Sequence, residues 1–253
     1  MGIDKLDLNT KAQELREALG EDANSPVDIF SLVNQIKDLT LVFYPLGENI
    51  SGMCFRDEGV KLIAVNSSMS YGRQRFSLAH ELYHLYYDDD TGFNVCSKIL
   101  NTKSENEKCA DQFASYFLAP YKSLRTKVRN VVGDGEITLS CIIELEQYVG
   151  MSHMAMFWRL VGEGYLSDDR REEFCENVRV SSRARSLGYD TKLYKPYQVS
   201  GQRRTYGYYL KQVEQLREKG LVSPGKIDEL LIEAFREDIA FGLDDEQGGD
   251  VID

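Results

Sequence analysis

Residues 75–90 read RFSLAHELYHLYYDDD and contain the pattern HELYH at residues 80–84. Apolar residues recur around this pattern with the period of a helix, so the spacing predicts one helix over 71–87. Side chains four residues apart share a helix face, so the imidazoles of His80 and His84 can reach a single ion. Glu81 points to the open side of that ion, where it can take a proton from a metal-bound water. The pattern therefore predicts a metal-dependent peptidase with Glu81 as general base.

The alternative for this stretch is a surface helix that carries two solvated histidines. Four apolar residues surround the pattern, namely Leu78, Ala79, Leu82 and Leu85. They predict a largely buried helix, in which two histidines without a partner would be unfavourable. We therefore favour a metal site over the solvated alternative.

A second stretch, ENEKCADQFASYFL at residues 105–118, predicts another helix and can supply the third ligand. A catalytic zinc needs three protein ligands and an open position. Glu107 is the expected third ligand, and Glu105 is the alternative. Asp111 lies one turn after Glu107 and is expected to accept the other N–H of a ligating histidine, which fixes its tautomer. Two nitrogen ligands and one carboxylate favour Zn2+, although Mn2+ also fits such a site.

Other polar residues are weaker candidates. Cys109 lies on a different face from Glu107 and is expected to be a packed thiol. His153 lies in a separate segment and is expected to be structural, with oxyanion stabilisation as its alternative. Four tyrosines can donate a hydrogen bond to an oxyanion, and the sequence does not choose among them: Tyr83, Tyr86, Tyr87 and Tyr116.

The overall pattern predicts an α+β fold with two parts. Residues 1–132 are expected to form a domain of helices beside a small antiparallel sheet, and residues 133–253 a mainly helical region that binds a substrate or partner. That region is expected to end in a frayed acidic tail from Gly242, and residues 167–206 are left unassigned. Further helices are predicted over 8–20, 26–37, 137–149, 152–161, 208–219 and 223–235, and strands over 39–44, 50–55 and 61–66.

Composition narrows the class of protein. The chain has 253 residues and a formal net charge of −11, which argues against binding nucleic acid over a broad surface. It contains no apolar run of about 18 residues and no apolar signal core at its start, so neither a transmembrane helix nor secretion is expected. Its five cysteines lack CxxC spacing, which favours free thiols in a reducing compartment. We expect a cytoplasmic protein.

Two stretches resemble the ImmA/IrrE family of metallopeptidases. They are RQRFSLAHELYHL at Arg73–Leu85 and ENEKCADQFASYFLAP at Glu105–Pro120. The resemblance extends over about residues 26–166 and implies a zincin-like fold. One departure is Tyr83, where the family commonly has glycine. Tyrosine keeps both ligands and the base, but it can crowd the neighbouring core or shape the cleft.

The resemblance implies site-specific proteolysis in phage, mobile-element or stress-response regulation. The expected partner is a protein substrate such as a helix-turn-helix repressor or an antitoxin. Two alternatives from other classes stay open. One is a non-catalytic interaction protein that retains the metal fold. The other is a DNA-binding regulator that uses residues 137–160 as a helix-turn-helix, although the second helix there offers only Arg159 as a strong phosphate donor.

Overall fold

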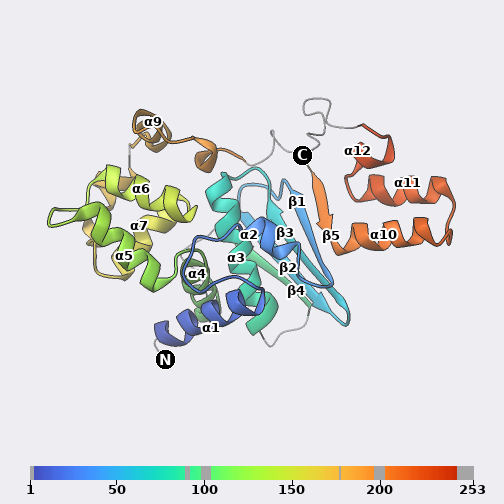
Figure 1. The fold of residues 1–253 in the computed structure, drawn as a ribbon, viewed down its shortest axis with the longest axis horizontal. Helices are drawn as coiled ribbons and strands as arrows, with labels where there is room; N and C mark the ends of the chain where they lie inside the picture. The colour runs from blue at the N-terminus through green and yellow to red at the C-terminus, as the bar shows by residue number, and fades with distance from the viewer. Residues whose placement is uncertain (1–2, 89–91, 98–103, 177, 197–202, 244–253) are drawn as a thin grey trace.

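The computed structural model describes residues 3–88, 92–97, 104–176, 178–196 and 203–243, with the backbone alone over 92–97. The described elements include both helices and strands in the first part of the chain and are mainly helical afterwards (Figure 1). In chain order they are α1 (Lys5–Ala18), α2 (Ile29–Val33), β1 (Leu39–Tyr44), β2 (Ile50–Asp57), β3 (Val60–Asn66), α3 (Tyr71–Tyr87), β4 (Gly92–Ser97), α4 (Glu105–Leu118), α5 (Tyr121–Val132), α6 (Leu139–Val149), α7 (His153–Gly162), η2 (Asp168–Arg170), α8 (Arg171–Cys175), α9 (Val180–Ser186), η3 (Lys192–Tyr194), β5 (Arg204–Gly207), α10 (Tyr208–Glu218), α11 (Pro224–Glu233) and α12 (Glu237–Ala240). The α+β class expected from the sequence is confirmed.

The sheet has the strand order β4-β2-β3-β1-β5 and is mixed, not wholly antiparallel. The expectation of an antiparallel sheet was wrong for β1 and β3, which run parallel with Thr40 opposite Leu62. After β1 the chain forms β2, and a tight turn at Gly59 leads into β3. Strand β3 pairs with both, so it lies between β1 and β2 in the sheet. The φ angle of Gly59 is 75°, a left-handed conformation that glycine adopts without strain. Short turns on both sides of β2 predict two successive hairpins. They do not tell whether β3 lies at the edge of the sheet or between β1 and β2.

The far edge of the sheet is β5, which comes from the C-terminal part of the chain. It pairs antiparallel with β1, with Thr40 opposite Gly207. Its four residues, RTYG, show no alternation of apolar and polar side chains, so the sequence did not predict it. The second part of the chain thus completes the sheet of the first, and the division after residue 132 stays a prediction.

Helix α3 packs along β2 and β3 on one face of the sheet, and α4 packs on α3 (Figure 1). Thirteen of the seventeen residues of α3 are buried, including both histidines and Glu81. One continuous hydrophobic core runs from Leu8 in α1 to Phe174 in α8. The predicted bounds of α3 and α4 are confirmed. These two helices carry the candidate ligands, and they pack against each other in the core.

Other helices depart from the expected bounds. The helix expected over 26–37 is limited to α2, which ends at Val33. Turns follow it, and the last of them contains Asp38, whose φ angle is 63°, directly before β1. Helix α5 was not predicted. Its buried side chains are Leu124 and Val128 alone, and most of the others are basic or polar, so its apolar stripe is narrow.

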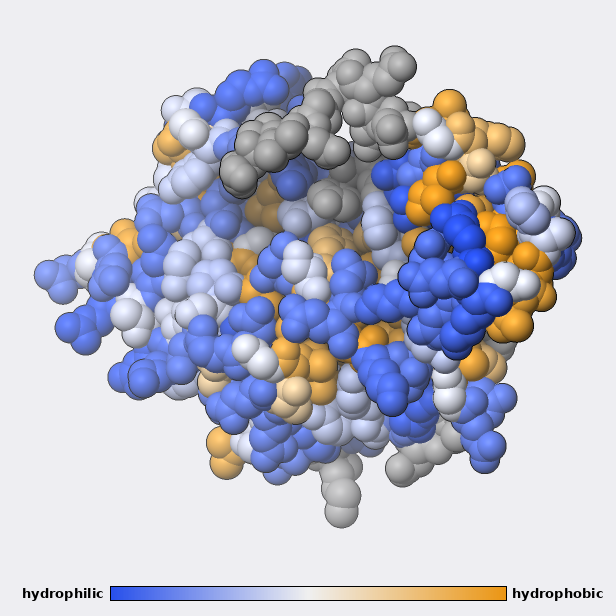
Figure 2. All heavy atoms as spheres, turned by 45° about the vertical axis from the view of Figure 1, so that its right-hand side comes forward, coloured by the Kyte–Doolittle hydropathy of each residue, from blue (hydrophilic) through white to orange (hydrophobic). Residues whose placement is uncertain are grey.

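Helices α10 and α11 confirm two predictions and pack around a small cluster of their own, formed by Val213, Ile227 and Leu231. Figure 2 shows apolar surface on the side of the molecule that carries them. The exposed apolar side chains of this region are Leu221, Ile232, Ile239, Phe241 and Leu243. The frayed tail was expected from Gly242. Its residues after Leu243 lie outside the described residues. Within the described part, no helix has the length and apolarity required to cross a membrane.

Candidate metal centre

Helix α3 brings the two histidines together as the four-residue spacing predicts. Their Nε2 atoms lie 3.1 Å apart, and the residues His80 and His84 are 5% and 3% exposed. The end of α3 is held by Arg56 of β2, which donates hydrogen bonds to the carbonyl oxygens of Leu85 (2.9 Å) and Asp88 (2.8 Å). The sheet therefore fixes the helix end that positions the second imidazole.

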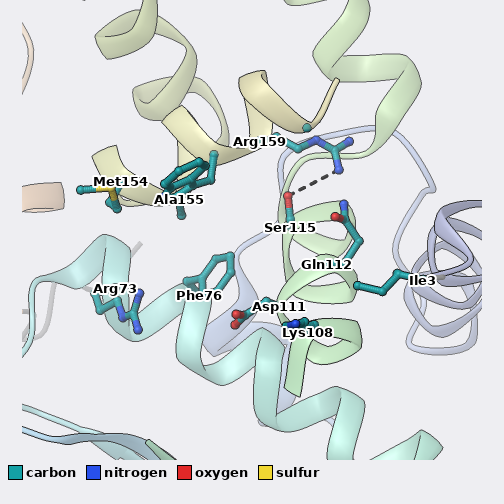
Figure 3. A pocket seen from close by; sticks show the side chains of 12 residues that line it. Ile3, Arg73, Phe76, Lys108, Asp111, Gln112, Ser115, Met154, Ala155 and Arg159 are labelled. Atoms are coloured by element: carbon teal, nitrogen blue, oxygen red, sulfur yellow. Dashed lines mark hydrogen bonds between the residues drawn. The ribbon is translucent and has the colours of Figure 1, made fainter. Parts of the chain in front are cut away.

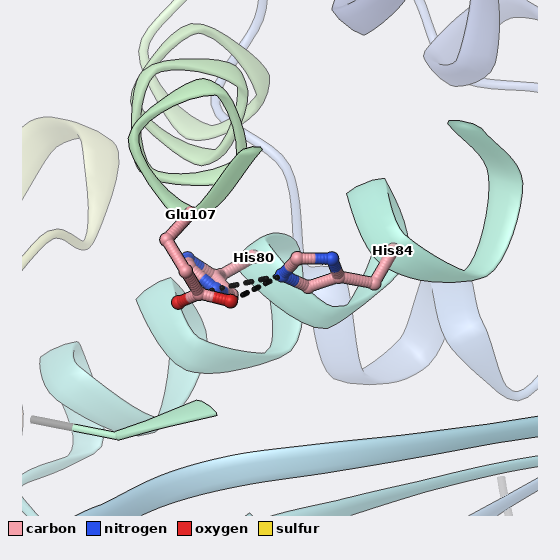
Figure 4. Close-up of side chains that lie close together, drawn as sticks. All are labelled: His80, His84 and Glu107. Atoms are coloured by element: carbon pink, nitrogen blue, oxygen red, sulfur yellow. Dashed lines mark hydrogen bonds and ion pairs between the residues drawn. The ribbon is translucent and has the colours of Figure 1, made fainter. Parts of the chain in front are cut away.

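Helix α4 places Glu107 opposite the pair. The Ser104 hydroxyl accepts a hydrogen bond from the backbone N–H of Glu107, which begins the helix with that carboxylate turned toward α3 (Figure 4). Its Oε2 lies 3.4 Å from His80 Nε2, and its Oε1 lies 3.2 Å from His84 Nε2. One ligand atom from each of the three residues lies within 4.8 Å of the others.

These donors fit a metal ion. Two imidazole nitrogens and one carboxylate form a ligand set that zinc accepts, and three protein ligands leave a position for water. The group His80, His84 and Glu107 can therefore bind a metal. Glu105, the alternative third ligand, is exposed at the start of α4 and is not part of this group.

A carboxylate holds the outer nitrogen of each imidazole. Nδ1 of His80 donates to Oδ1 of Asp111 at 2.9 Å, the contact expected from the spacing of Glu107 and Asp111. Nδ1 of His84 donates to Oδ2 of Asp88 at 2.6 Å. Asp88 was not among the residues that the sequence predicted for the site. The available signal was again the spacing, since Asp88 follows His84 by four residues.

The charges of the group suit a cation. Burial disfavours a charge on His80, but the hydrogen bonds to Asp111 and Glu107 outweigh it and raise the pKa of His80 to about 9. Burial also opposes a charge on His84, yet the pKa of His84 is raised, chiefly by its bond to Glu107. Burial would raise the pKa of Glu107, but the two imidazoles hold it well below its usual range. The site thus retains a negative carboxylate, and its surroundings favour positive charge on the imidazole side.

Glu81 is fully buried between α3 and β2. Gly52 of β2 faces it closely, since a Cβ atom at Gly52 would lie 2.6 Å from Oε1 of Glu81. Cys54, two residues further on the same face of the strand, also contacts it. Burial raises the pKa of the Cys54 thiol, and so does its hydrogen bond to the Glu81 carboxylate. Strand β2 therefore confines the side chain expected to act as the base.

The weaker candidates lie elsewhere or have structural partners. Cys109 is half-buried and packs against the core, as expected. His153 pairs with Glu146 in the α6–α7 region. The hydroxyl of Tyr87 donates to the carbonyl of Lys11 at 2.9 Å, and the ring of Tyr116 stacks under a guanidinium. An oxyanion donor is not identified among the described tyrosines.

Comparison with known proteins agrees with this geometry. Residues 36–160 match the family model of the IrrE N-terminal-like domain, a peptidase family. A comparison with curated proteins found no match. The matched region includes β1 to β3, both ligand-bearing helices, α5, α6 and most of α7, and the family supports a metallopeptidase-type function. Residues 36–160 therefore form a domain of the ImmA/IrrE metallopeptidase family.

Proposed function

We propose that this protein is a zinc-dependent endopeptidase that cleaves a specific regulatory protein, such as a helix-turn-helix repressor. The observation that carries the proposal is the convergence of His80, His84 and Glu107 on one point inside a domain of a peptidase family. Glu81, directly beside the first histidine, supports catalysis over a purely structural metal, because a structural site needs no base.

In this proposal His80, His84 and Glu107 hold the ion, and Asp111 and Asp88 hold the imidazoles in the tautomer that leaves Nε2 free for it. Bound zinc supplies a water of lowered pKa and polarises the scissile carbonyl. Glu81 would act as the general base that accepts a proton from the attacking water and passes it to the leaving amine. Gly52 and Cys54 keep the Glu81 carboxylate in place by excluding other positions for it.

The substrate class rests on the family and on charge. The chain is acidic overall, and its region 167–206 is richer in arginine and tyrosine. We assign target selection to that region, because a local basic patch can hold an acidic partner. Direct DNA binding by α7 is disfavoured, since Arg159 is 3% exposed and donates to the carbonyl of Ala119 at 3.1 Å.

The second candidate is a non-catalytic partner-binding protein that retains the metal fold. The two are separated by Glu81→Gln, which keeps size and polarity but cannot act as a base at neutral pH. Cells that express wild type or this variant are compared by proteomics of new chain ends, after zinc content is shown to be equal. Glu105→Gln, at an exposed glutamate, is the matched control.

We expect a target fragment with wild type and with Glu105→Gln, and a reduction of about 10²–10⁴-fold in its formation with Glu81→Gln. A regulatory phenotype that persists unchanged in Glu81→Gln, at equal expression and zinc content, would contradict the peptidase proposal and support the non-catalytic one.

A further inference from the structure

A cavity of about 360 Å³ lies where α3, α4 and α7 meet, beside the metal centre (Figure 3). Phe76 of α3 and Met154 and Trp158 of α7 form an apolar wall. Trp158 is 43% exposed and Met154 37%, so this wall is open to solvent. Asp111 also lines the cavity, and its carboxylate is bound to His80 at 2.9 Å. Only the Asp111 side chain therefore separates the cavity from His80, a candidate ligand of the metal.

Arg73 projects from α3 on the side of the cavity that faces Asp111 (Figure 3). Its Nε atom is buried and has no hydrogen-bond partner among the described residues. Burial lowers the pKa of Arg73, and the charge of Asp111 opposes that effect in part. By contrast, Arg75 on the same helix donates to the carbonyl oxygens of Gly150 (2.9 Å) and Val27. Arg73 as a whole is half-buried, and a guanidinium whose buried N–H is unused gains free energy when a carboxylate reaches it.

The charge of the lining favours an anion. Lys108 lies exposed on the rim, and no ion pair or hydrogen bond of its side chain occurs within the described part of the chain. Arg159, at the other end, is paired with Glu163 at 3.4 Å. Asp111 is the only acid among the described residues that line the cavity, and its Oδ1 is already bound to His80. The cavity is therefore a cationic spot in a chain whose net charge is −11.

We propose that this cavity binds a carboxylate carried on a compact apolar body, with the carboxylate on Arg73 and the body against Phe76 and Trp158. The volume is that of a small-molecule site, and a mainly apolar wall with a few polar groups is typical of such sites. A free organic acid presents this chemistry, and so does an acidic side chain beside an aromatic residue in a bound peptide. The proposal does not depend on proteolysis.

Trp158 is the only tryptophan of the chain, so tryptophan fluorescence reports on this cavity alone. The full-length protein is titrated with hydrocinnamate and with its neutral counterpart of the same shape, hydrocinnamamide. We expect a saturable change with the acid, and binding of the amide at least about tenfold weaker, because a charge-assisted hydrogen bond is lost. Equal affinity for acid and amide, or no saturable binding of the acid up to about 10 mM, would overturn the proposal.

Variants locate the carboxylate. Arg73→Gln is expected to weaken hydrocinnamate binding about tenfold or more and to leave the amide unchanged, because only the acid uses the guanidinium. Arg185→Gln, at an exposed arginine of α9, is the matched control and is expected to change neither. Calorimetry on Trp158→Phe checks that binding persists without the fluorophore. Unchanged acid binding in a folded Arg73→Gln would refute the role of Arg73.

Titration with a capped peptide, acetyl-Phe-Glu-amide, tells whether the cavity takes its carboxylate from a free organic acid or from an acidic side chain of a peptide. Tighter binding of the peptide than of hydrocinnamate assigns the cavity to an acidic side chain of a protein partner. Binding of hydrocinnamate alone assigns it to a free small acid. The absence of both rejects the site.

Discussion

Two buried clusters of histidine and carboxylate occur in the described part of this protein, and they differ in how they are satisfied. In the α6–α7 cluster, Nδ1 of His153 faces Oε2 of Glu146 at 2.9 Å, and Nε2 donates to the carbonyl of Phe174 at 2.8 Å. The hydroxyl of Tyr194 donates to the other oxygen of Glu146 at 2.6 Å. Every ring nitrogen and carboxylate oxygen there has a protein partner.

The α3–α4 cluster is arranged differently. Its outer nitrogens are held by Asp111 and Asp88, but the two Nε2 atoms face each other and share one carboxylate, that of Glu107. Two imidazoles in such contact compete for protons, whereas one cation satisfies all three groups. A cluster whose polar atoms all pair with one another leaves no position for an ion, whereas a cluster whose donors converge on one point can hold one.

The largest expected effect separates the two clusters by zinc. With zinc at about 1,000 times its dissociation constant, the free energy of unfolding of wild type should rise by about 4 kcal/mol. His84→Ala should abolish this gain, because it removes a ligand. His153→Ala should lower the stability of the protein but leave the gain from zinc intact. Thermal unfolding with zinc and with EDTA measures both, and a zinc gain that survives in His84→Ala would break the distinction.

Strand β2 can be tested next, through Gly52→Ala. The added methyl group would lie 2.6 Å from Oε1 of Glu81, so the carboxylate must move. A displacement of about 1 Å at a reacting group can reduce the rate about 10²-fold. We expect cleavage of the natural target to fall by about that factor while zinc content is retained. Wild-type cleavage by Gly52→Ala would show that β2 does not confine the base.

A smaller effect is expected for the carboxylates behind the imidazoles. Asp111→Ala and Asp88→Ala should each weaken zinc binding by about 10–100-fold without abolishing it. Competition with a chelator of known affinity measures the change. Asp169→Ala, at an exposed aspartate of η2, is the control. Wild-type affinity in both variants would show that these hydrogen bonds do not support the site.

The smallest effect is a pH dependence of the closed cluster. Burial opposes a charge on His153, but Glu146 outweighs it and the pKa of His153 is raised. Burial raises the pKa of Glu146 as well, with His153 opposing. Both shifts mean that the folded pair holds its proton more tightly than the unfolded chain does. The contribution of His153 is therefore complete below the ordinary histidine pKa of about 6.5, and that of Glu146 below the ordinary glutamate pKa of 4.5. Each contribution is lost as pH rises through the folded pKa of its group.

This sign is checked by denaturant unfolding at about pH 6 and about pH 9 in EDTA. Wild type is compared with the double variant Glu146→Gln/His153→Gln, which removes both titrating groups. The stability advantage of wild type should shrink at the higher pH. If the stability advantage of wild type over the double variant grew with pH, then a shared proton would not hold His153 and Glu146 together.

The sequence predicted the local parts of this centre well. The bounds of α3 and α4, and the positions of His80, His84, Glu107 and Asp111 on them, follow from helical spacing, which depends on near neighbours alone. Asp88 follows the same rule but was not among the residues predicted for the site.

The sequence did not predict the long-range parts. The parallel pairing of β1 with β3 depends on which strand inserts between others, and β5 joins from about 160 residues further along the chain. The contact of Gly52 with Glu81 has the same origin, because it exists only once β2 packs on α3. Neither spacing nor composition contains that information.

The most direct measurement for the central claim is the zinc content of purified protein, with Glu107→Ala compared with Glu105→Ala. Both variants remove a glutamate from the first turn of α4, and only Glu107 belongs to the group that converges with the histidines. We predict one zinc ion per chain in wild type and in Glu105→Ala, and strongly reduced zinc in Glu107→Ala. Full zinc occupancy in Glu107→Ala, or loss of zinc in Glu105→Ala, would contradict the assignment of the metal centre.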